Sequence, residues 1–437
     1  MGTYFNGFMF MRLVFFLTWF LLLLSNSFSS LQPLCHEDES SALMQFKHRF
    51  VINKFVSSYP FAYPKVASWK NNSDCCSWDG VECSEDTGHV VSLDLSSSCL
   101  YGSINSNSSL FHLVHLRRLN LADNHFNYSQ IPFRVAHLSR LEYLNLSLSK
   151  FSGTEQDLIT GHLPAFNSSS PLKVLGLGGT SFSGELPASI GNLNSLHALD
   201  LRDCRFSGSI PNSLANLTQL IFLDLSRNSG NMLQGSLPVL PPSIQSLEVW
   251  DNAFTGKISP WVCNLTSLVE LDLSYNRLSG TLHPCLGNFS RSLKVLSLKS
   301  NNFHGIIPKG WAKGGNLQQW NSMRTYDAKK LTYLLVGVND NGWNDSFDYL
   351  VTITNKGKEQ EYEKILDVLT VIDFSCNRFR GEIPKAVGNL TELHLFDFSN
   401  NGLTGHIPSS LGNLKNLEAM DLAQNKLVER YHRNWCS

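Results

Sequence analysis

Few residues of this 437-residue chain combine the type and spacing that catalysis or metal binding requires. His112 and His115 are three residues apart, which would suit a metal if both lay on one helix. They fall between repeated apolar segments instead, and we expect them on the solvated surface. Gly176-x-Gly178-Gly179 follows a strand-like segment, but no helix signal comes after it, so a phosphate-binding loop is not expected.

The remaining candidates for enzyme chemistry are also weak. Aspartates recur at one position of a repeated segment, as at Asp94, Asp200, Asp224 and Asp272, and such recurrence reflects the repeat, not a catalytic pair. The chain has no His-Glu-x-x-His, Gly-x-Ser-x-Gly, Walker or kinase motif. We therefore expect no enzyme activity, no cofactor and no metal.

The composition of the chain excludes a further class of function. The chain has 35 basic and 36 acidic side chains, so its formal charge is −1, and this excludes a nucleic-acid binder driven by a large positive field. Charged residues are 16% of the total and hydrophobic residues 42%, enough for a sizeable core. The polar surface must come from Asn, Ser, Thr and Gly, which suits a glycosylated secreted protein.

The N-terminus has the pattern of a secretory signal peptide. Arg12 precedes an apolar run, Leu13–Leu24, and the small polar stretch Ser25–Ser30 follows it. The alternative is a membrane anchor, but twelve helical residues reach only about 18 Å across a hydrocarbon layer of roughly 30 Å. We expect residues 1–30 to be removed and the chain as written to be secreted.

Glycosylation signals agree with this route. Ten Asn-x-Ser/Thr sequons follow the signal peptide, and together they predict heavy N-glycosylation. They are Asn71, Asn107, Asn127, Asn145, Asn167, Asn216, Asn264, Asn288, Asn344 and Asn389. The ten cysteines indicate the same oxidising compartment.

A repeat of about 24 residues organises the chain. Regular copies start at Leu196, Leu220, Ile244, Leu268, Leu293, Leu369, Leu393 and Leu417, and looser copies start near Val90, Leu116, Leu141 and Leu172. About twelve repeats result. One repeat cannot bury its own apolar face, so the copies are expected to stack into a solenoid.

The spacing within a repeat has a physical reason. In Leu199-x-Leu201 the period-two alternation points both leucines inward from a short strand. An asparagine usually follows three residues later, where its amide could bond the backbone of the neighbouring coil. These are Asn124, Asn252, Asn276, Asn301, Asn377, Asn401 and Asn425. Cys204 and Thr180 occupy the same position, which predicts a buried thiol at Cys204.

With Gly208, Ile210 and Pro211 completing one copy, these residues resemble the leucine-rich repeat consensus in its plant extracellular form. The resemblance implies an α/β leucine-rich repeat solenoid, with a curved parallel sheet on the concave face. Irregular or short helical segments are expected on the outside.

The cysteines fit a capped solenoid. Cys263 and Cys285 lie at similar depths of successive coils, which favours a disulfide between them. Near the N-terminus, four cysteines alone would allow three pairings, and a zinc site is disfavoured because no Cys-x-x-Cys pair occurs. The segment resembles the plant leucine-rich repeat N-terminal cap, which implies Cys35–Cys75 and Cys76–Cys83. Cys99, Cys376 and Cys436 have no expected partner.

An interruption of the repeat narrows the family that the chain resembles. The period stops after Pro308 and returns at Leu369, and the alternating residues Tyr349–Thr354 predict a strand between them. The stretch resembles the island of plant receptor-like proteins, including the Cf-type resistance proteins. The matching residues are Lys356, Gly357, Glu361, Tyr362, Ile365 and Leu366.

The expected organisation has six parts. Residues 1–30 are the signal peptide, 31–89 the N-terminal cap, 90–310 repeats 1–9, 311–367 the island, 368–427 repeats 10–12, and 428–437 a divergent tail. Because the last copy lacks its Gly-x-Ile-Pro half, and neither a C-terminal cap nor a membrane helix follows, we expect a truncated member of the family with a marginally ordered last coil.

With enzyme activity and nucleic-acid binding set aside, the function that we expect is recognition of a ligand. Side chains that differ between coils should point outward from the concave strands, and the Trp, Tyr and Arg among them are typical of binding hot spots. The candidates are Arg202, Asp203, Arg227, Glu248, Trp250, Asp251, Tyr275 and Lys299. We expect Trp250 to be outward, and its replacement by Ala to weaken ligand binding without unfolding the protein.

The family resemblance implies a kinase-free cell-surface receptor in plant defence or development. Its expected partners are an extracellular protein, peptide or glycan and a receptor kinase, and the full-length relatives reside at the plasma membrane. Two alternatives remain open. One is a secreted inhibitor of microbial cell-wall enzymes, similar to polygalacturonase-inhibiting proteins, and the other is a non-functional fragment.

Overall fold

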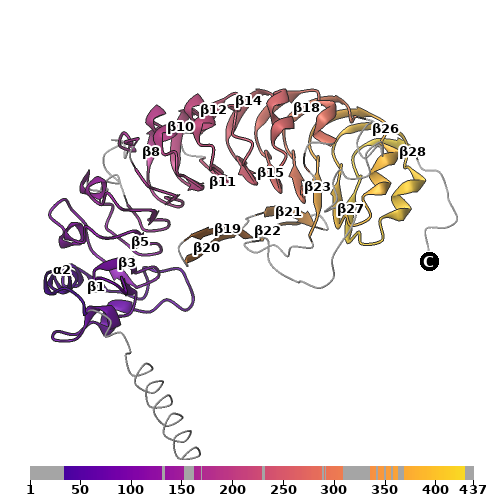
Figure 1. The fold of residues 1–437 in the computed structure, drawn as a ribbon. Helices are drawn as coiled ribbons and strands as arrows, with labels where there is room; N and C mark the ends of the chain where they lie inside the picture. The colour runs from indigo at the N-terminus through magenta and orange to yellow at the C-terminus, as the bar shows by residue number, and fades with distance from the viewer. Residues whose placement is uncertain are drawn as a thin grey trace, which may run out of the picture.

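The computed structural model describes residues 34–129, 133–151, 162–168, 170–228, 232–287, 290, 292–308, 335–340, 343–348, 351–355, 358–362 and 369–428. Residues 1–30, predicted to be a signal peptide, and residues 429–437 of the predicted tail lie outside these residues. Figure 1 shows an arc of stacked coils, with the cap at one end and the last repeats at the other. The described part contains no helix long and apolar enough to cross a membrane.

The inner side of the arc is one thirteen-stranded sheet, which begins at β2 (Val81–Cys83) of the cap. Its other strands come one from each coil and pair in parallel with their neighbours. They are β3 (Val90–Asp94), β5 (Arg118–Asn120), β6 (Tyr143–Asn145), β7 (Val174–Gly176), β9 (Ala198–Asp200), β11 (Phe222–Asp224), β13 (Ser246–Glu248), β15 (Glu270–Asp272), β17 (Val295–Ser297), β23 (Val371–Asp373), β25 (Leu395–Asp397) and β27 (Ala419–Asp421).

A second sheet lies on the other side of the core, where the sequence predicted irregular or helical segments. Nine short strands of the described coils form it. They are β8 (Ser183–Glu185), β10 (Arg205–Ser209), β12 (Leu233–Gly235), β14 (Ala253–Lys257), β16 (Arg277–Gly280), β18 (Asn302–Ile306), β24 (Arg378–Gly381), β26 (Gly402–His406) and β28 (Lys426–Val428). Glycines at positive φ recur in this segment, for example Gly208 at 77° and Gly256 at 85°, a conformation that an L side chain resists.

Short 3₁₀ helices complete the outer side of the coils. They are η3 (Ser109–His112), η4 (Phe133–His137), η5 (Ala188–Asn192), η6 (Asn212–Asn216), η7 (Pro260–Asn264), η8 (Pro284–Gly287), η10 (Lys385–Asn389) and η11 (Ser409–Asn413). The leucines of the period-two strands, such as Leu199 and Leu223, point into the continuous core between the two sheets and are fully buried.

The asparagine of each coil makes the bonds expected of it. The Asn276 amide donates to the carbonyl of Val249 in the preceding coil at 2.9 Å, and its oxygen accepts from the Phe254 amide at 3.0 Å. Asn228, which the sequence reading did not include, makes the same bonds to Leu201 and Phe206. These amides satisfy backbone groups that the turn would otherwise bury without a partner.

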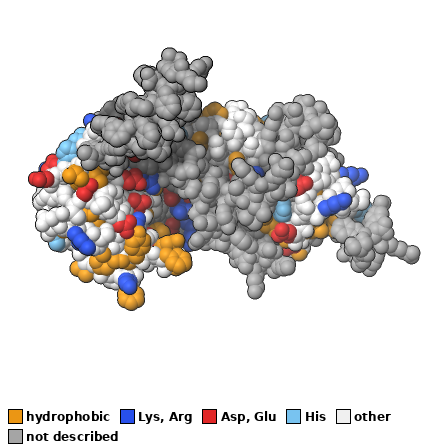
Figure 2. Space-filling model, turned by 60° about the horizontal axis from the view of Figure 1, so that its bottom comes forward, with side chains coloured by type: hydrophobic (Ala, Val, Ile, Leu, Met, Phe, Trp, Pro, Cys, Tyr) orange, Lys and Arg blue, Asp and Glu red, His pale blue; other side chains and the backbone are white. Residues whose placement is uncertain are grey.

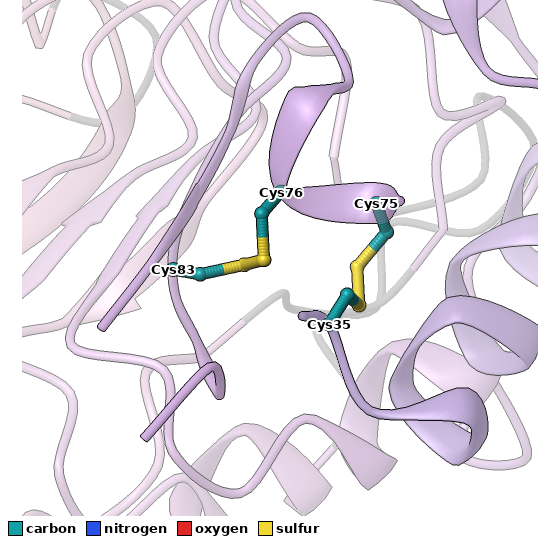
Figure 3. A group of neighbouring side chains, drawn as sticks. All are labelled: Cys35, Cys75, Cys76 and Cys83. Carbon is teal, nitrogen blue, oxygen red and sulfur yellow. A yellow bond between two sulfur atoms is a disulfide. The ribbon is translucent and has the colours of Figure 1, made fainter. Parts of the chain in front are cut away.

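The N-terminal cap is built from short elements around one helix. These are α2 (Glu37–Lys47), β1 (Val51–Ile52) paired with β4 (Leu100–Tyr101), η1 (Lys65–Ser68) and η2 (Cys75–Ser77). Trp69 and Trp78 stack at 5.3 Å inside it. Cys35 is bonded to Cys75 and Cys76 to Cys83, the pairs that the family resemblance implies (Figure 3).

The repeats before and after the island stack directly on each other. Val295 of β17 pairs with Val371 of β23, and His304 of β18 pairs with Arg378 of β24. The intervening segment contains two antiparallel hairpins, β19 (Leu335–Asp340) with β20 (Trp343–Asp348) and β21 (Val351–Asn355) with β22 (Lys358–Tyr362). In the view of Figure 1 both hairpins lie on the concave side of the arc.

The island motif is divided between described and undescribed residues. Glu361 and Tyr362 are in β22, and β21 includes most of the strand predicted at Tyr349–Thr354. The other four matching residues, Lys356, Gly357, Ile365 and Leu366, lie outside the described residues.

Candidate functional site

The concave face carries three rows of side chains that run across the strands. The first and second rows are the first and last residues of each three-residue strand, because alternate residues share a face. The third row lies two residues further along the chain. Rows aligned in this way bring residues about 24 positions apart into contact. Phe222, for example, pairs with Ser246, and Asp224 with Glu248.

A turn follows the third row, and four of the candidate residues occupy it. Asp203, Arg227, Asp251 and Tyr275 all have a left-handed backbone, with φ between 50° and 54°. Asp203 is exposed and the other three are half-buried. The turn therefore aligns these four side chains along one edge of the concave face, over strands β9 to β15.

The third row holds Arg202, Trp250 and Lys299. The expectation that Trp250 stands outward is wrong, because this side chain is only 7% exposed. The Arg227 guanidinium lies 5.6 Å from its ring centre. Lys299 is also buried, at 6% exposure, with its ammonium 5.2 Å from the Tyr275 ring, whereas Arg202 is partly exposed. These contacts position cations against aromatic faces.

Glu248 is the second correction. It was expected on the outward surface, but it is fully buried in the second row, between Asp224 on β11 and Asp272 on β15. One oxygen of each of these three carboxylates makes no hydrogen bond within the described structure. Arg202 approaches this group, with its Nη1 4.0 Å from Asp224 and its Nε 3.6 Å from Asp200.

Glu270 is a site residue that the sequence reading missed. The first row is apolar on many strands, where Tyr143, Val174, Ala198, Phe222, Val295, Val371 and Leu395 form a separate hydrophobic cluster. Glu270 and its neighbour Ser246 interrupt this cluster. The Ser246 hydroxyl lies 3.2 Å from Glu270 and 3.4 Å from Glu248, so one serine links two carboxylates. The signal in the sequence that could have identified Glu270 is a glutamate at a strand position that is apolar in many other repeats.

The electrostatic consequence is a set of carboxyl groups that hold protons strongly. Burial, reinforced by the nearby Asp200, raises the pKa of Asp224 to about 7, and burial raises the pKa of Asp272 to about 6. Burial also raises the pKa values of Glu248 and Glu270 well above the ordinary value, with neighbouring carboxylates adding to the shift. We call Asp224, Glu248, Glu270 and Asp272 the acidic centre.

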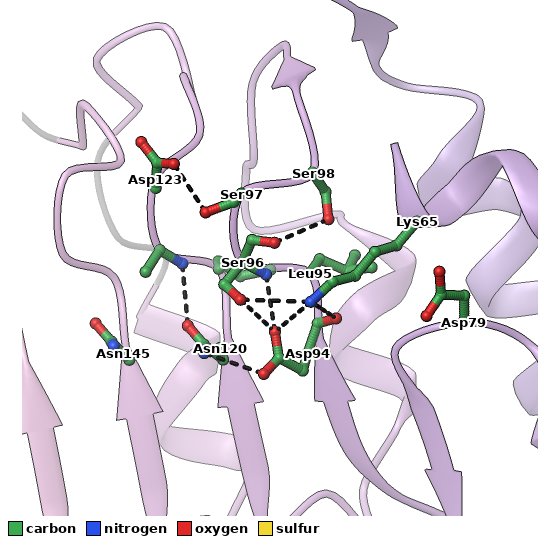
Figure 4. Close-up of polar contacts among 12 residues, drawn as sticks. Lys65, Asp79, Asp94, Leu95, Ser96, Ser97, Ser98, Asn120, Asp123 and Asn145 are labelled. Carbon is green, nitrogen blue, oxygen red and sulfur yellow. Dashed lines mark hydrogen bonds and ion pairs between the residues drawn. The ribbon is translucent and has the colours of Figure 1, made fainter. Parts of the chain in front are cut away.

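The cap end of the same face has different electrostatics. Lys65 of the cap pairs with Asp94 at 2.9 Å, and Ser96 donates to the same carboxylate (Figure 4). Burial acts to raise the pKa of Asp94, but the Lys65 charge and the Ser96 bonds outweigh it and lower this pKa. Asn120 on the next strand donates to the other oxygen at 3.2 Å. Figure 2 shows acidic and basic side chains gathered on the hollowed face near the cap.

Among the described residues, the remaining cysteines provide one disulfide and no reactive pair of thiols. Cys263 is joined to Cys285 across neighbouring coils, as the similar positions of the two residues predict. Cys204 is buried among Leu177 and Thr180, and burial raises the pKa of its thiol to about 12, so it remains protonated. Cys99 and Cys376 are unpaired within the described residues, and Cys436 lies outside them.

The predicted glycosylation sites fall into two groups. Seven are exposed: Asn71, Asn107, Asn127, Asn167, Asn216, Asn264 and Asn389. Asn145 differs because it is the last residue of β6 on the concave face, and its amide contacts the Tyr143 hydroxyl and the Ser147 amide. The Asn288 and Asn344 side chains are outside the described part.

Family comparisons agree with the repeat architecture. The model described as Leucine rich repeat N-terminal domain matches residues 36–84, and that described as Leucine-rich repeat region matches 156–334. The Leucine Rich Repeat model matches residues 368–390 and 392–414.

Similar proteins of known class are more specific than the family models. Receptor-like protein 6 of Arabidopsis thaliana is 48% identical over 153 residues, covering 32% of this chain and 15% of the relative. Receptor-like protein Cf-9 of Solanum pimpinellifolium is 34% identical over 243 residues, covering 44% and 28%. A solved structure, "Plant peptide hormone receptor RGFR1 in complex with RGF2", matches with a TM-score of 0.54 and 25% identity, over 73% of this chain and 41% of that one.

The fold and these matches define a leucine-rich repeat protein. More narrowly, the curated relatives that it matches are plant receptor-like proteins, and it is similar to them over parts of its length. The matches span less than a third of the length of these curated relatives.

Proposed function

We propose that this protein is an extracellular recognition module of a kinase-free receptor, and that its concave face over strands β9 to β17 binds a peptide ligand in plant defence or developmental signalling. The observation that carries this proposal is the alignment of Asp203, Arg227, Asp251 and Tyr275 on successive turns. Their side chains differ in charge and shape while their backbones are equivalent, as a recognition surface requires.

Two further observations support a ligand site at this place. Arg202, Trp250 and Lys299 form an adjacent row, so charged and aromatic groups of the kinds enriched in binding hot spots lie side by side. The similar solved structure is that of a peptide hormone receptor in complex with RGF2. A peptide laid across the strands would contact the accessible turn residues of successive coils, Asp203, Arg227, Asp251 and Tyr275.

Binding can be tested without knowing the natural ligand. The purified glycoprotein would be used to select from a phage-displayed library of random twelve-residue peptides. We expect selected peptides to bind the wild type and to lose at least tenfold in affinity with Asp203→Lys/Asp251→Lys, because both side chains would be reversed in charge at the proposed edge.

A charge-matched control distinguishes this edge from the general surface. Glu382→Lys/Glu418→Lys makes the same change in net charge at two exposed residues outside the rows, and it should bind the peptides like the wild type. Selection of no peptide, or equal binding by all three proteins, would overturn the proposal.

The signalling step follows from the receptor class. We propose that a receptor kinase acts as the co-receptor at the plasma membrane and supplies the catalytic domain. Co-immunoprecipitation of the protein expressed in plant cells, with and without a selected peptide, tests this step. A kinase-free precipitate under both conditions would contradict it.

A further inference from the structure

Three residues far apart in the sequence meet where the cap joins the solenoid. Glu39 comes from helix α2 of the cap, His89 immediately precedes β3, and His115 lies three residues before β5. One potential metal-binding atom from each lies within 4.8 Å of the others. His115 was expected on the solvated surface. It is half-buried, and one of its ring nitrogens lies near Glu39 and His89.

The carboxylate is held firmly in place. Glu39 is 4% exposed, and its Oε2 accepts a hydrogen bond from the Val90 amide at 2.8 Å. Its Oε1 lies 3.3 Å from Nδ1 of His89. A buried carboxylate oriented by a backbone N–H and directed at an imidazole has the arrangement that commonly supports metal-binding groups.

The two imidazoles are arranged by stacking. The rings of His89 and His115 lie 3.7 Å apart with planes 16° from parallel, and His36 stacks on the other face of His89 at 3.8 Å. The Nε2 atom of His36 lies 2.9 Å from the Thr87 carbonyl, so this nitrogen is engaged outside the cluster. His36 thus serves to fix the His89 ring.

One cation stands near the cluster. The Arg140 Nη1 atom lies 3.1 Å from Nδ1 of His115, and the Arg140 side chain is exposed. Being at the surface, this guanidinium can move into solvent when another cation takes its place. The cluster is reachable from solvent because His89 is 28% exposed and His115 is half-buried.

We propose that Glu39, His89 and His115 bind a divalent transition metal of the zinc class and thereby join the cap to the first two repeats. Two imidazole nitrogens and one carboxylate oxygen form a donor set that zinc takes with a fourth position left to water. This set suits zinc better than calcium or magnesium, which prefer oxygen donors alone.

Other potential metal groups in the described part do not compete with this one. Cys35, Cys75, Cys76 and Cys83 form two disulfides, so their sulfurs are not thiolates. The group formed by Cys263, Cys285 and His283 likewise contains a disulfide. Zinc bound by the folded oxidised protein is therefore expected at the histidine cluster.

The test is a titration of zinc chloride into the secreted glycoprotein, prepared without a polyhistidine tag and treated with a chelator, by isothermal calorimetry. We expect one zinc ion per chain. Cobalt binding followed by visible absorption gives an independent readout, since a site with two histidines and one carboxylate should show d–d bands.

The variants make the assignment specific. Glu39→Gln retains an oxygen for the Val90 amide and removes the negative charge, so the fold should survive. His115→Gln removes a metal-binding nitrogen, and each change should weaken zinc binding at least tenfold, since losing even a supporting partner costs roughly 10–100-fold. His112→Gln, three residues away at an exposed histidine, is the matched control and should leave binding unchanged.

Three results would overturn the proposal. They are the absence of zinc uptake, wild-type affinity in Glu39→Gln, and an equal loss of affinity in His112→Gln. Unfolding curves recorded in chelator identify a variant that fails to fold, and if His115→Gln does so, the isosteric Glu39→Gln decides the question.

Discussion

The side-chain amide of Asn377 donates a hydrogen bond of 2.8 Å to the carbonyl of Leu298, 79 residues earlier in the chain. In other repeats the same bond joins residues 27 or 28 apart, as from Asn252 to Leu225 and from Asn301 to Leu273. The solenoid therefore continues across the island with the contacts of two ordinary neighbouring coils.

Replacing Asn377 should uncouple the repeats on the two sides of the island. Its amide also contacts Phe374 and Ser375, and its oxygen accepts from the Phe303 amide. Asn377→Ala leaves several buried backbone groups without partners, and we expect a loss of about 3 kcal/mol in unfolding free energy. Hydrogen exchange should show faster opening of residues 369–428 than of the earlier coils.

The matched control for this change is Asn425→Ala in the last described coil. Asn425 makes the same kind of bonds, but it is half-buried and water can replace them. A smaller loss of stability is expected there. Equal losses in the two variants would show that the coils around the island have no special dependence on Asn377.

The acidic centre should make stability fall as the pH rises. Its four carboxyl groups have pKa values raised by burial, to about 7 at Asp224 and about 6 at Asp272. Between roughly pH 4, where unfolded carboxyls titrate, and pH 7 the folded state binds more protons than the unfolded state. Its stability therefore declines across this window. The melting temperature should be higher at about pH 5 than at about pH 7.5.

Glu270→Gln tests the source of this pH dependence. The amide retains an acceptor for Ser246 and removes one buried charge, so the variant should melt higher at about pH 7.5 and vary less with pH. Glu418→Gln, at an exposed residue, should change neither quantity. A melting temperature that rises from pH 5 to pH 7.5 in the wild type would contradict the assignment.

Trp250 should contribute to stability through its ring and not through its N–H group. It is 7% exposed, and its indole nitrogen has no hydrogen-bond partner in the described structure. Trp250→Phe is expected to cost less than about 1.5 kcal/mol and Trp250→Ala about 3 kcal/mol. Chemical denaturation measures both. A larger loss in the Phe variant than in the Ala variant would indicate an essential indole N–H.

Glycan occupancy should divide the sequons. Asn216, Asn264 and Asn389 each end a 3₁₀ helix and are exposed, so they should carry glycans. Asn145 lies in the concave sheet with its amide engaged, and it should be unmodified in the folded secreted protein. Enzymatic deglycosylation in heavy-oxygen water followed by peptide mass spectrometry reads each site. A fully occupied Asn145 would contradict this placement.

The repeat could be predicted from the sequence because each copy contains the residues that specify its own strand and turn. Leu199 and Leu201 define a strand and its buried face, and the asparagine at a fixed distance defines the turn. The burial of Trp250 and Glu248 could not be predicted in this way, because period-two alternation gives the face of a sheet and not the exposure of that face. The second sheet was missed because its strands show no period-two alternation of apolar residues, as in β10 (Arg205–Ser209), where Phe206 is the single apolar residue.

The cluster of Glu39, His89 and His115 could not be predicted from the sequence either. Its members come from the cap and from two coils, and no repeat period relates the cap helix to the coils. Only the docking of α2 against the first repeats brings the carboxylate to the two histidines.

The left-handed turn after each concave strand creates a competition between durability and recognition. Residues such as Arg227 and Tyr275 hold a positive φ that costs an L-residue about 1 kcal/mol and costs glycine almost nothing. A sequence selected only for heat resistance would fill these turns with glycine, as Gly179 already does. Under the proposed function, Asp203, Arg227, Asp251 and Tyr275 present chemical groups at the expense of a more robust coil. A thermostabilised variant that replaced these four residues with glycine would then be expected to lose ligand binding.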